Sequence, residues 1–319
     1  MRAALFESYG GVDRLQVREV ENPGPPGPGQ VLVRVRASSV NPLDWRIRQG
    51  QLRLVMPAKL PLIAGFDLAG EVEAVGPEVT RFAPGDAVFG QTGNRHGGAC
   101  AELALALESA LATKPEALSF EEAAAIPMGG LTALQALRDH GELAANERVL
   151  VLGASGGVGH FAVQIAGILG ARVAAVASGS NQDFLRKLGA ERIFDYQAED
   201  FRDDEEVYEV IFDAAGKSSY QDCALSLAEA GVYVTTEVGP RPFFAVMASR
   251  FRGLFGEDRR ARMFWVKARA ADLELLGRWA REGRLRPVLE KVFPLEEIRQ
   301  AHEASETGHV RGKIGVRIS

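Results

Sequence analysis

A glycine-rich turn is the stretch of this sequence whose residue types and spacing point most clearly to chemistry. Val149–Gly159 reads Val-Leu-Val-Leu-Gly-Ala-Ser-Gly-Gly-Val-Gly, an apolar run that breaks into glycines. A helical pattern of apolar residues follows at once. Such a turn lets the backbone approach a pyrophosphate, while the free N–H groups of the helix point at it. The spacing predicts a dinucleotide site, although Ala154 stands where the Gly-x-Gly-x-x-Gly fingerprint, completed here by Gly156 and Gly159, has its first glycine.

The residues around this turn predict a doubly wound parallel sheet. Apolar residues recur with helical spacing as far as Gly170, which we expect to end the first helix. Strands then alternate with helices, the pattern of a parallel sheet covered by helices. Gly189 and Gly231 are expected to end the next two helices. The predicted strands are Arg172–Ser178, Arg192–Asp195, Val207–Asp213, Val232–Val238 and Met263–Lys267, and the predicted helices between them are Asn181–Leu188 and Ser218–Glu229.

The first part of the chain is predicted to be rich in β-strands. Residues 30–40 alternate apolar and polar side chains, which is typical of a half-buried strand. Short strands with glycines between them continue to about residue 110 and suggest a partly closed barrel. Ser119 and Glu122 form a capping box for a helix that ends before Pro127, and Thr132–His140 is helical again, with Gly141 as its stop. Lys313–Ile318 is expected to return to the barrel. We therefore predict two domains, 1–122 with 269–319, and 123–268.

Composition narrows the class of protein. The 319 residues are 46% hydrophobic and carry a formal net charge of −5, which disfavours a nucleic-acid surface. Cys100 and Cys223 are too few for a disulfide framework and are expected to be reduced. No apolar run has the length of a membrane span, and no secretory leader is visible, so we expect a cytoplasmic protein without an integral membrane segment.

The end of the second predicted strand indicates which cofactor the turn binds. In NAD sites an acidic residue about 20 residues past the glycines binds the ribose 2′-hydroxyl. Here Ser178, Ser180 and Asn181 stand in that region, with Arg186 and Lys187 further along the helix. Hydroxyl, amide and cationic donors suit a 2′-phosphate, so we expect NADP(H). In the alternative, these residues merely cap the helix, with Asn181 as its N-cap.

Six motifs spread along the chain carry a family resemblance when they are taken together: Ser39–Asp44, Gly65–Val72, Pro84–Gly90, Gly129–Ala133, Ala154–Gly159 and Arg311–Lys313. With them the sequence resembles the medium-chain dehydrogenases/reductases of the zinc-independent quinone oxidoreductase (zeta-crystallin-like) type, over nearly the whole chain. The resemblance implies a GroES-like β-barrel catalytic domain, completed by the C-terminal segment, and an inserted Rossmann nucleotide-binding domain.

One departure from the family's alcohol dehydrogenases bears on the reaction. Those proteins carry Gly-His-Glu where this chain has Gly65-Phe66-Asp67, and a cysteine where it has Asn41. Phenylalanine and asparagine are not zinc ligands, and the structural zinc lobe is also missing. Without a Lewis acid, the substrate must already be electrophilic. The resemblance therefore implies hydride transfer from NADPH to a quinone or an α,β-unsaturated carbonyl.

The resemblance also implies the site residues. Asn41 is expected to donate to the substrate oxygen or the nicotinamide ribose, Thr132 to lie beside the nicotinamide, and Lys313 to contact the cofactor. In the alternatives, Asn41 caps a turn, Thr132 bonds its own helix backbone and Lys313 is a surface charge. Tyr196, expected to pack beside the adenosine or to donate to its phosphate, is in its alternative a half-buried tyrosine that closes a strand. The expected cofactor contacts are Asn41, Thr132, Ala154, Ser155, Gly156, Gly157, Val158, Ser178, Ser180, Asn181, Tyr196, Ala215, Val238, Gly239 and Lys313.

Other functions stay open at this point. An enoyl-thioester reductase shares the scaffold, and a non-catalytic NADPH-binding protein is a third possibility. The segment Arg241–Lys267 is rich in aromatic residues and arginines, and it is interpreted as a lid or substrate wall, a dimer contact or a peripheral membrane contact. By resemblance, the strand Met263–Lys267 would pair sheets across a homodimer.

Overall fold

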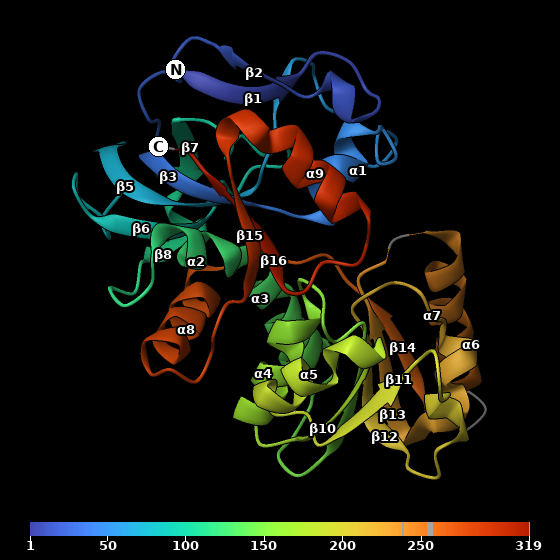
Figure 1. Cartoon of the computed structure of the whole chain (residues 1–319). Coiled ribbons are helices and arrows are strands. Elements are labelled where there is room, and N and C mark those ends of the chain that lie inside the picture. The colour runs from blue at the N-terminus through green and yellow to red at the C-terminus, as the bar shows by residue number, and fades with distance from the viewer. Residues whose placement is uncertain (238, 254–257, 319) are drawn as a thin grey trace. The chain divides into compact units, whose positions relative to one another are not determined.

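The chain divides into two compact units, which a computed structural model describes over residues 1–237, 239–253 and 258–318 (Figure 1). Unit 1 comprises Met1–Leu131 with Ala268–Ser319, and unit 2 comprises Thr132–Lys267. The chain thus enters unit 2 within helix α3 (Pro127–Leu134) and leaves it after Lys267. The crossings expected from the sequence lie after residues 122 and 268, so the first lies earlier in the chain than in the structure and the second differs by one residue.

Strand β3 (Gln30–Val40) is the central strand of unit 1. Its inward side chains are fully buried and Arg34 is exposed, so the predicted alternation is confirmed. It pairs antiparallel with β5 (Asp67–Val75), β7 (Leu103–Leu107) and the C-terminal strand β16 (Lys313–Arg317). The predicted return of the chain to the N-terminal sheet is therefore correct. The inward residues are Val31, Val33, Val35 and Ala37.

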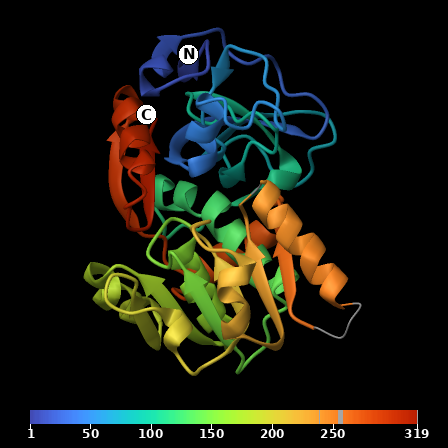
Figure 2. The same cartoon turned by 90° about the vertical axis from the view of Figure 1, so that its right-hand side faces the viewer.

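Two sheets build unit 1. The larger has the order β15-β16-β3-β5-β6-β8, with β7 also on β3, and the smaller has the order β2-β1-β4. Figure 2 shows the C-terminal segment (red) near the N-terminal strands (blue), where Arg2 pairs with Glu296. The remaining strands are β1 (Arg2–Phe6), β2 (Gln16–Glu19), β4 (Leu62–Ile63), β6 (Ala87–Gln91), β8 (Leu111–Thr113) and β15 (Leu289–Pro294).

The helices of unit 1 begin and end largely where local sequence signals predict. The Ser119 hydroxyl accepts from the Glu122 N–H at 3.1 Å, and the Glu122 carboxylate accepts from the Ser119 N–H at 2.8 Å, so the capping box is confirmed. Helix α3 starts at Pro127, earlier than expected, because proline fits the first turn of a helix. The helices are α1 (Pro42–Arg48), α2 (Phe120–Ala125), α8 (Ala270–Arg281) and α9 (Ile298–Glu306).

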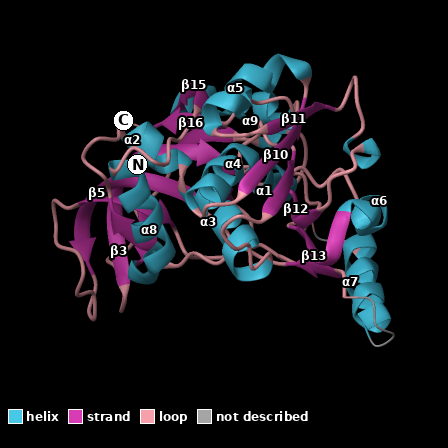
Figure 3. Ribbon diagram, turned by 90° about the horizontal axis from the view of Figure 1, so that it is seen from below, coloured by secondary structure: helices cyan, strands magenta, loops and turns pink. Residues whose placement is uncertain are grey.

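Unit 2 is the predicted doubly wound α/β domain. Its parallel sheet has the order β11-β10-β9-β12-β13-β14. Figure 3 shows strands of this sheet (magenta) with helices such as α4 (cyan) beside them. Helix α4 contacts β9 and β10, α5 contacts β11, and α7 contacts β14. The strands are β9 (Arg148–Leu152), β10 (Arg172–Ala177), β11 (Arg192–Asp195), β12 (Tyr208–Asp213), β13 (Leu227–Thr235) and β14 (Arg260–Met263), and the helices are α4 (Gly159–Ile168), α5 (Gln182–Leu188), α6 (Tyr220–Cys223) and α7 (Pro240–Gly253).

Three predicted elements of unit 2 are wrong in extent. The strand expected over Val232–Val238 is β13, which begins earlier, at Leu227, and ends at Thr235. The helix expected over Ser218–Glu229 is the much shorter α6, and Gly231 lies inside β13 and does not end a helix. It stands at a register shift between β12 and β13, where a Cβ would come within 2.9 Å of the Tyr208 carbonyl oxygen. Glycine is required there by a bulge, which in sequence looks like a helix stop. The last strand, expected over Met263–Lys267, is β14 and ends at Met263.

The segment Arg241–Lys267 forms most of α7 and all of β14. Residues 254–257 of the segment lie outside the described part of the chain, and several of its described apolar side chains are exposed. Within the described residues, no helix combines the length and the apolar character that a bilayer span requires. The exposed side chains are Phe243, Phe244, Met247 and Trp265.

Candidate functional site

Two positions of the glycine turn between β9 and α4, Gly153 and Gly159, have no room for a side chain. Gly153 has a φ of +71°, and a Cβ there would stand 2.6 Å from the Ala215 Cβ. At Gly159 a Cβ would stand 2.2 Å from the Gly153 carbonyl oxygen. In the fingerprint the first glycine falls at Ala154. The residue before it, Gly153, therefore supplies the conformational freedom that this glycine provides in other proteins. The third glycine packs the helix onto the strand, as the fingerprint requires.

The middle of the turn leaves room for a ligand. A Cβ on Gly156 would meet no described atom closer than the Gly153 carbonyl oxygen, at 3.5 Å. Ser155, Gly157 and Val158 are half-buried beside it, and α4 begins at the next residue. The first N–H groups of a helix have no partners within the helix and attract anions. This open backbone at a helix N-terminus fits the pyrophosphate of a dinucleotide.

The end of β10 carries neutral hydrogen-bonding groups, as predicted. The Ser178 and Ser180 hydroxyl oxygens lie 3.2 Å apart, and the Asn181 amide donates to Ser178 at 2.9 Å. The Arg186 guanidinium, in contrast, is already engaged within α5. It pairs with Asp183 at 2.7 Å and donates to the Gln182 side chain at 3.1 Å. The expectation that Arg186 serves a 2′-phosphate is therefore not supported by its position, while Lys187 is exposed.

An acidic residue that the sequence analysis did not single out lies next to this group. A Cβ on Gly179 would stand 2.3 Å from a carboxylate oxygen of Asp195, the last residue of β11. The strand pairing explains the contact, because Ala177 lies opposite Asp195. The neighbouring Tyr196 is 56% exposed, which excludes the half-buried alternative and leaves its ring accessible.

The remaining predicted cofactor residues of unit 2 are Ala215, Val238, Gly239 and Thr132. Ala215 follows β12 and contacts the Gly153 position, so it borders the glycine turn. Gly239 has open space where a Cβ would lie, and Val238 falls outside the described residues. Thr132 is buried in α3, and its hydroxyl has no recorded hydrogen bond to the described residues. The self-bonded alternative for Thr132 therefore has no support in the geometry.

In unit 1, strand register gathers a buried group of polar side chains, here called the polar cluster: Asn41, Asp44, Asp67, Gln91 and Lys313. Asp67 starts β5 and lies opposite Ser39 on β3 and Gln91 on β6. Lys313 starts β16, next to the residue that pairs with Val40. Each member of the cluster is at most 6% exposed. Lys313 is therefore a buried cation, and the surface-charge alternative is wrong.

Asp67 is the centre of the polar cluster. One of its carboxylate oxygens accepts from the Ser39 hydroxyl at 2.8 Å and from the Asn41 amide at 2.9 Å. The other oxygen accepts from the Gln91 amide and from the Met128 N–H, each at 3.0 Å. The Lys313 Nζ lies 3.7 Å from the first oxygen. A buried carboxylate with this many donors is well compensated.

The orientation of the Asn41 amide follows from its partners. Lysine can only donate, so the oxygen Oδ1 of Asn41 accepts from Lys313 Nζ. The carboxylate of Asp67 can only accept, so the Asn41 nitrogen Nδ2 faces it. One N–H of the amide is thus used within the protein and one is left. Asn41 directly precedes α1, but its side-chain amide is hydrogen-bonded to Asp67 on β5 and to Lys313 on β16, so it does not merely cap a turn.

The polar cluster also perturbs two ionisable groups. Burial raises the pKa of the Asp44 carboxyl to about 7, although the Asn41 N–H donates to its Oδ2 at 2.7 Å. Its other oxygen is buried without a hydrogen-bond partner among the described residues. Burial lowers the pKa of Lys313, and the carboxylates of Asp67 and Asp44 oppose that effect. The cluster can therefore hold a proton close to neutral pH.

Metal-binding side chains do not assemble in the described residues: no group of three or more histidine, cysteine or acidic side chains is placed to hold an ion. The amide of Asn41 and the ammonium group of Lys313 lie next to Asp67, and the aromatic residue Phe66 precedes it in the chain. A buried ammonium next to the carboxylate competes electrostatically with a divalent cation. This donor set does not suit zinc.

Comparison with known proteins gives results over both units. Residues 27–136 match the family model described as alcohol dehydrogenase GroES-like domain, and residues 188–316 match the one described as zinc-binding dehydrogenase. The chain is 32% identical over 326 residues to quinone-oxidoreductase QR1, chloroplastic, of Triphysaria versicolor, covering 99% of this chain and 98% of that protein.

Two further relatives are informative. The NADPH-dependent alkenal/one oxidoreductase, chloroplastic, of Arabidopsis thaliana is 32% identical over 332 residues, which cover 99% of this chain and 79% of that protein. The solved structure of the quinone oxidoreductase from Coxiella burnetii is 33% identical and superposes with a TM-score of 0.91, covering 100% of this chain and 99% of that one. Both the predicted resemblance and the predicted fold class are confirmed.

Proposed function

Because the chain belongs to the quinone oxidoreductase family of medium-chain dehydrogenases/reductases, we propose that it reduces quinones or α,β-unsaturated carbonyls with NADPH. The observation that carries the proposal is the glycine turn, whose open backbone at the N-terminus of α4 fits a dinucleotide pyrophosphate. The names of the Triphysaria and Arabidopsis relatives, a quinone oxidoreductase and an alkenal/one oxidoreductase, support the substrate class.

The cofactor supplies a hydride from C4 of its reduced nicotinamide when it is bound. The turn residues Ala154–Val158 would hold its pyrophosphate, and Tyr196 would pack beside its adenosine. Ser178, Ser180 and Asn181 would donate to the 2′-phosphate, and these neutral donors support NADPH over NADH. Asp195 weakens this preference, because a carboxylate repels a phosphate and accepts from a ribose hydroxyl.

The catalytic role of unit 1 is electrostatic. Hydride addition to a quinone or an enone places negative charge on the substrate oxygen, and a donor must be aimed there. The free N–H of Asn41 is our candidate for this donor, and Asp67 and Lys313 orient the amide. Lys313 adds positive charge behind it. We propose that Thr132, also assigned to the site, contacts the nicotinamide.

Activation of the substrate by zinc is not part of this proposal. The donor set around Asp67 supports a zinc-independent reaction, because neither an amide nor an ammonium group is a usual ligand of Zn²⁺. Elemental analysis of the purified protein checks this directly. Stoichiometric zinc that is lost together with activity on chelation would contradict it.

A spectrophotometric screen tests the substrate class. NADPH consumption would be followed with a quinone, a 2-alkenal and a crotonyl-type thioester at matched concentrations. We expect turnover of the quinone or the alkenal. Activity on the thioester alone would select an enoyl-thioester reductase, and NADPH binding without turnover of any acceptor would indicate a non-catalytic binding protein.

We also propose that the protein is a cytoplasmic homodimer. Strand β14 is at the edge of the unit 2 sheet, where its free backbone groups can pair with a second copy. Both cysteines are free and buried, which suits a reducing compartment. Light scattering on the purified chain measures the oligomeric state, and a monomer at micromolar concentration would contradict the dimer.

A further inference from the structure

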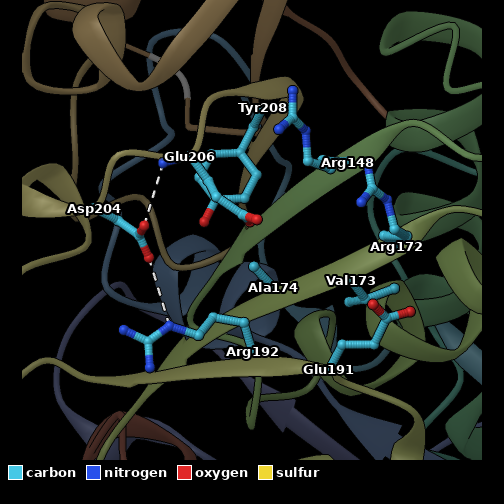
Figure 4. Close-up of a pocket in the computed structure, with 9 residues that line it drawn as sticks. All are labelled: Arg148, Arg172, Val173, Ala174, Glu191, Arg192, Asp204, Glu206 and Tyr208. Carbon is cyan, nitrogen blue, oxygen red and sulfur yellow. Dashed lines mark hydrogen bonds and ion pairs between the residues drawn. The ribbon is translucent and has the colours of Figure 1, made fainter.

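A pocket of about 370 Å³ lies at the edge of the unit 2 sheet opposite the glycine turn. It is formed where the strands begin, whereas the turn follows the carboxyl end of β9, so the two sites are separate. Ligand pockets usually have a volume of this order and a few convergent polar groups. Figure 4 shows the lining residues: Arg148, Arg172, Val173, Ala174, Glu191, Arg192, Asp204, Glu206 and Tyr208.

Two buried donors in this pocket have no partner among the described residues. The hydroxyl of Tyr208, a residue only 1% exposed, makes no hydrogen bond. Arg148 pairs with Glu209 through its Nη2 at 3.3 Å, but its Nε is buried and unpartnered. Burial raises the pKa of Tyr208 to about 12, so this phenol stays protonated and can donate. Buried polar groups are nearly always satisfied, so two such donors in one pocket call for an acceptor.

Two of the positively charged side chains that line the pocket come from directly opposite positions of adjacent strands. Strand register places Arg172 on β10 directly opposite Arg148 on β9. Arg172 is exposed and makes no recorded ion pair within the described part of the chain, whereas Arg192 pairs with Asp204 and Glu199. Like charges on adjacent strands repel, and a bound anion relieves that repulsion. Arginine is also the side chain best suited to carboxylates and phosphates.

The acidic residues of the pocket restrict what else the ligand carries. Asp204 is occupied, because its carboxylate accepts from Arg192 and from the Glu206 N–H. Glu191 and Glu206 are exposed at the same pocket, and neither carboxylate has a recorded partner in the described residues. They can accept hydrogen bonds from hydroxyl or ammonium groups. A purely anionic ligand would leave them unused.

We propose that this pocket binds a small metabolite whose carboxylate or phosphate group is held by Arg148, Arg172 and Tyr208, and whose hydroxyl or ammonium groups face Glu191 and Glu206. The site is independent of the reductase reaction, since none of these residues belongs to the glycine turn or the polar cluster. It gives this chain a second ligand, bound at the edge of the sheet opposite the glycine turn.

Calorimetric and thermal-shift titrations of the full chain without cofactor test the proposal, with inorganic phosphate and glycerol 3-phosphate as probes. Sodium chloride at equal ionic strength is the reference. We expect both probes to bind and to raise Tm beyond the chloride reference, the hydroxylated one more strongly. Tyr208→Phe and Arg172→Gln should each weaken binding about tenfold or more. Arg281→Gln, which removes an exposed charge on α8 of unit 1, should leave it unchanged.

Tyr208→Phe distinguishes a ligand-binding hydroxyl from a structural one. It removes a group with no protein partner, so the ligand-free variant should be at least as stable as the wild type while binding phosphate more weakly. A less stable variant that binds phosphate normally would overturn the proposal. So would no binding of either probe beyond chloride, or equal weakening by Arg281→Gln. NADPH affinity should be unaffected by every variant, which keeps this test distinct from that of the reductase function.

Discussion

The glycine turn and the polar cluster solve the same problem, positioning charge, in opposite ways. The turn uses backbone groups and depends on missing side chains at Gly153, Gly156 and Gly159. The polar cluster uses side chains that hold one another, with Asp67 at the centre. The turn should therefore be damaged by adding atoms, and the cluster by removing them or by changing their charge.

Adding one methyl group to the turn should have the largest effect. Gly159→Ala places a Cβ 2.2 Å from the Gly153 carbonyl oxygen and 2.7 Å from the Ala154 Cα, both backbone atoms that cannot give way. We expect the turn to open and NADPH affinity, measured by fluorescence titration, to fall by roughly a hundredfold or more, on the scale of several lost hydrogen bonds to a charged group.

Two other glycines calibrate this result. Gly167→Ala lies in the same helix with open space at its Cβ, and it should leave binding unchanged while stabilising the helix by about 0.5–1 kcal/mol. Gly156→Ala has room within the protein, so it should fold normally and still bind NADPH more weakly, because its Cβ enters the ligand space. Wild-type affinity in both Gly156→Ala and Gly159→Ala would place the cofactor elsewhere.

Removing the Asn41 amide should slow the reaction without a comparable effect on cofactor binding. Loss of one donor to a developing oxyanion costs about 10²-fold in kcat, so Asn41→Ala should fall in that range. Ser39→Ala is the matched control, since it removes a different donor to the same Asp67 oxygen. Equal losses in the two variants would assign the effect to Asp67 and not to a donor on the substrate.

The charge of the polar cluster should appear as a pH dependence of stability. Asp44 has a pKa of about 7 in the folded protein and an ordinary value near 3.9 when unfolded, so the folded state binds the extra proton between these values. Its stabilising contribution is complete at low pH and is lost as the pH rises to about 7. From about pH 5 to pH 8 the loss should be roughly 2–3 kcal/mol.

Asp44→Asn keeps an acceptor for the Asn41 N–H but cannot titrate. Denaturant unfolding at several pH values should show its stability rising relative to the wild type across that range. Asp86→Asn is the control, because Asp86 accepts from a backbone N–H at 2.8 Å in an exposed loop. Parallel pH profiles for wild type and Asp44→Asn would contradict the raised pKa.

The smallest expected effect concerns the choice of cofactor. Asp195→Asn removes a carboxylate beside Gly179 and should shift the ratio of NADPH to NADH affinity about fivefold toward NADPH, on the scale of the roughly 1 kcal/mol between two unit charges 4 Å apart in water. Asp203→Asn, an exposed acid of the same unit, should leave the ratio unchanged. An unchanged ratio in Asp195→Asn would place the 2′-phosphate away from this carboxylate.

Signals that are local in sequence were read correctly. The Ser119 capping box, the strand Gln30–Val40 and the left-handed Gly189 at the end of α5 each depend on a few neighbouring residues. Gly231 was misread because a helix stop and a bulge both demand glycine, and only the pairing of β12 with β13 distinguishes them.

The site residues that were missed depend on contacts between distant segments. Gln91 and Lys313 both contact Asp67 because β6 ends where β5 and β16 begin, and no spacing along the chain encodes that arrangement. Asp195 could not be recognised because the fingerprint places its acidic residue at the end of the second strand. Asp195 ends the third strand and reaches the site only through the pairing of β11 with β10. The turn was found because its strand, glycines and helix are consecutive.

Hydride transfer to an electrophilic acceptor is the central claim, and rapid mixing tests it most directly. The chain loaded with NADPH deuterated at C4 would be mixed with a quinone, and the absorbance of the reduced nicotinamide followed through a single turnover. We expect stoichiometric oxidation of the cofactor, formation of the hydroquinone and a primary deuterium isotope effect. A protein that binds no reduced nucleotide, or that leaves it unoxidised with every quinone and enone offered, would contradict the account.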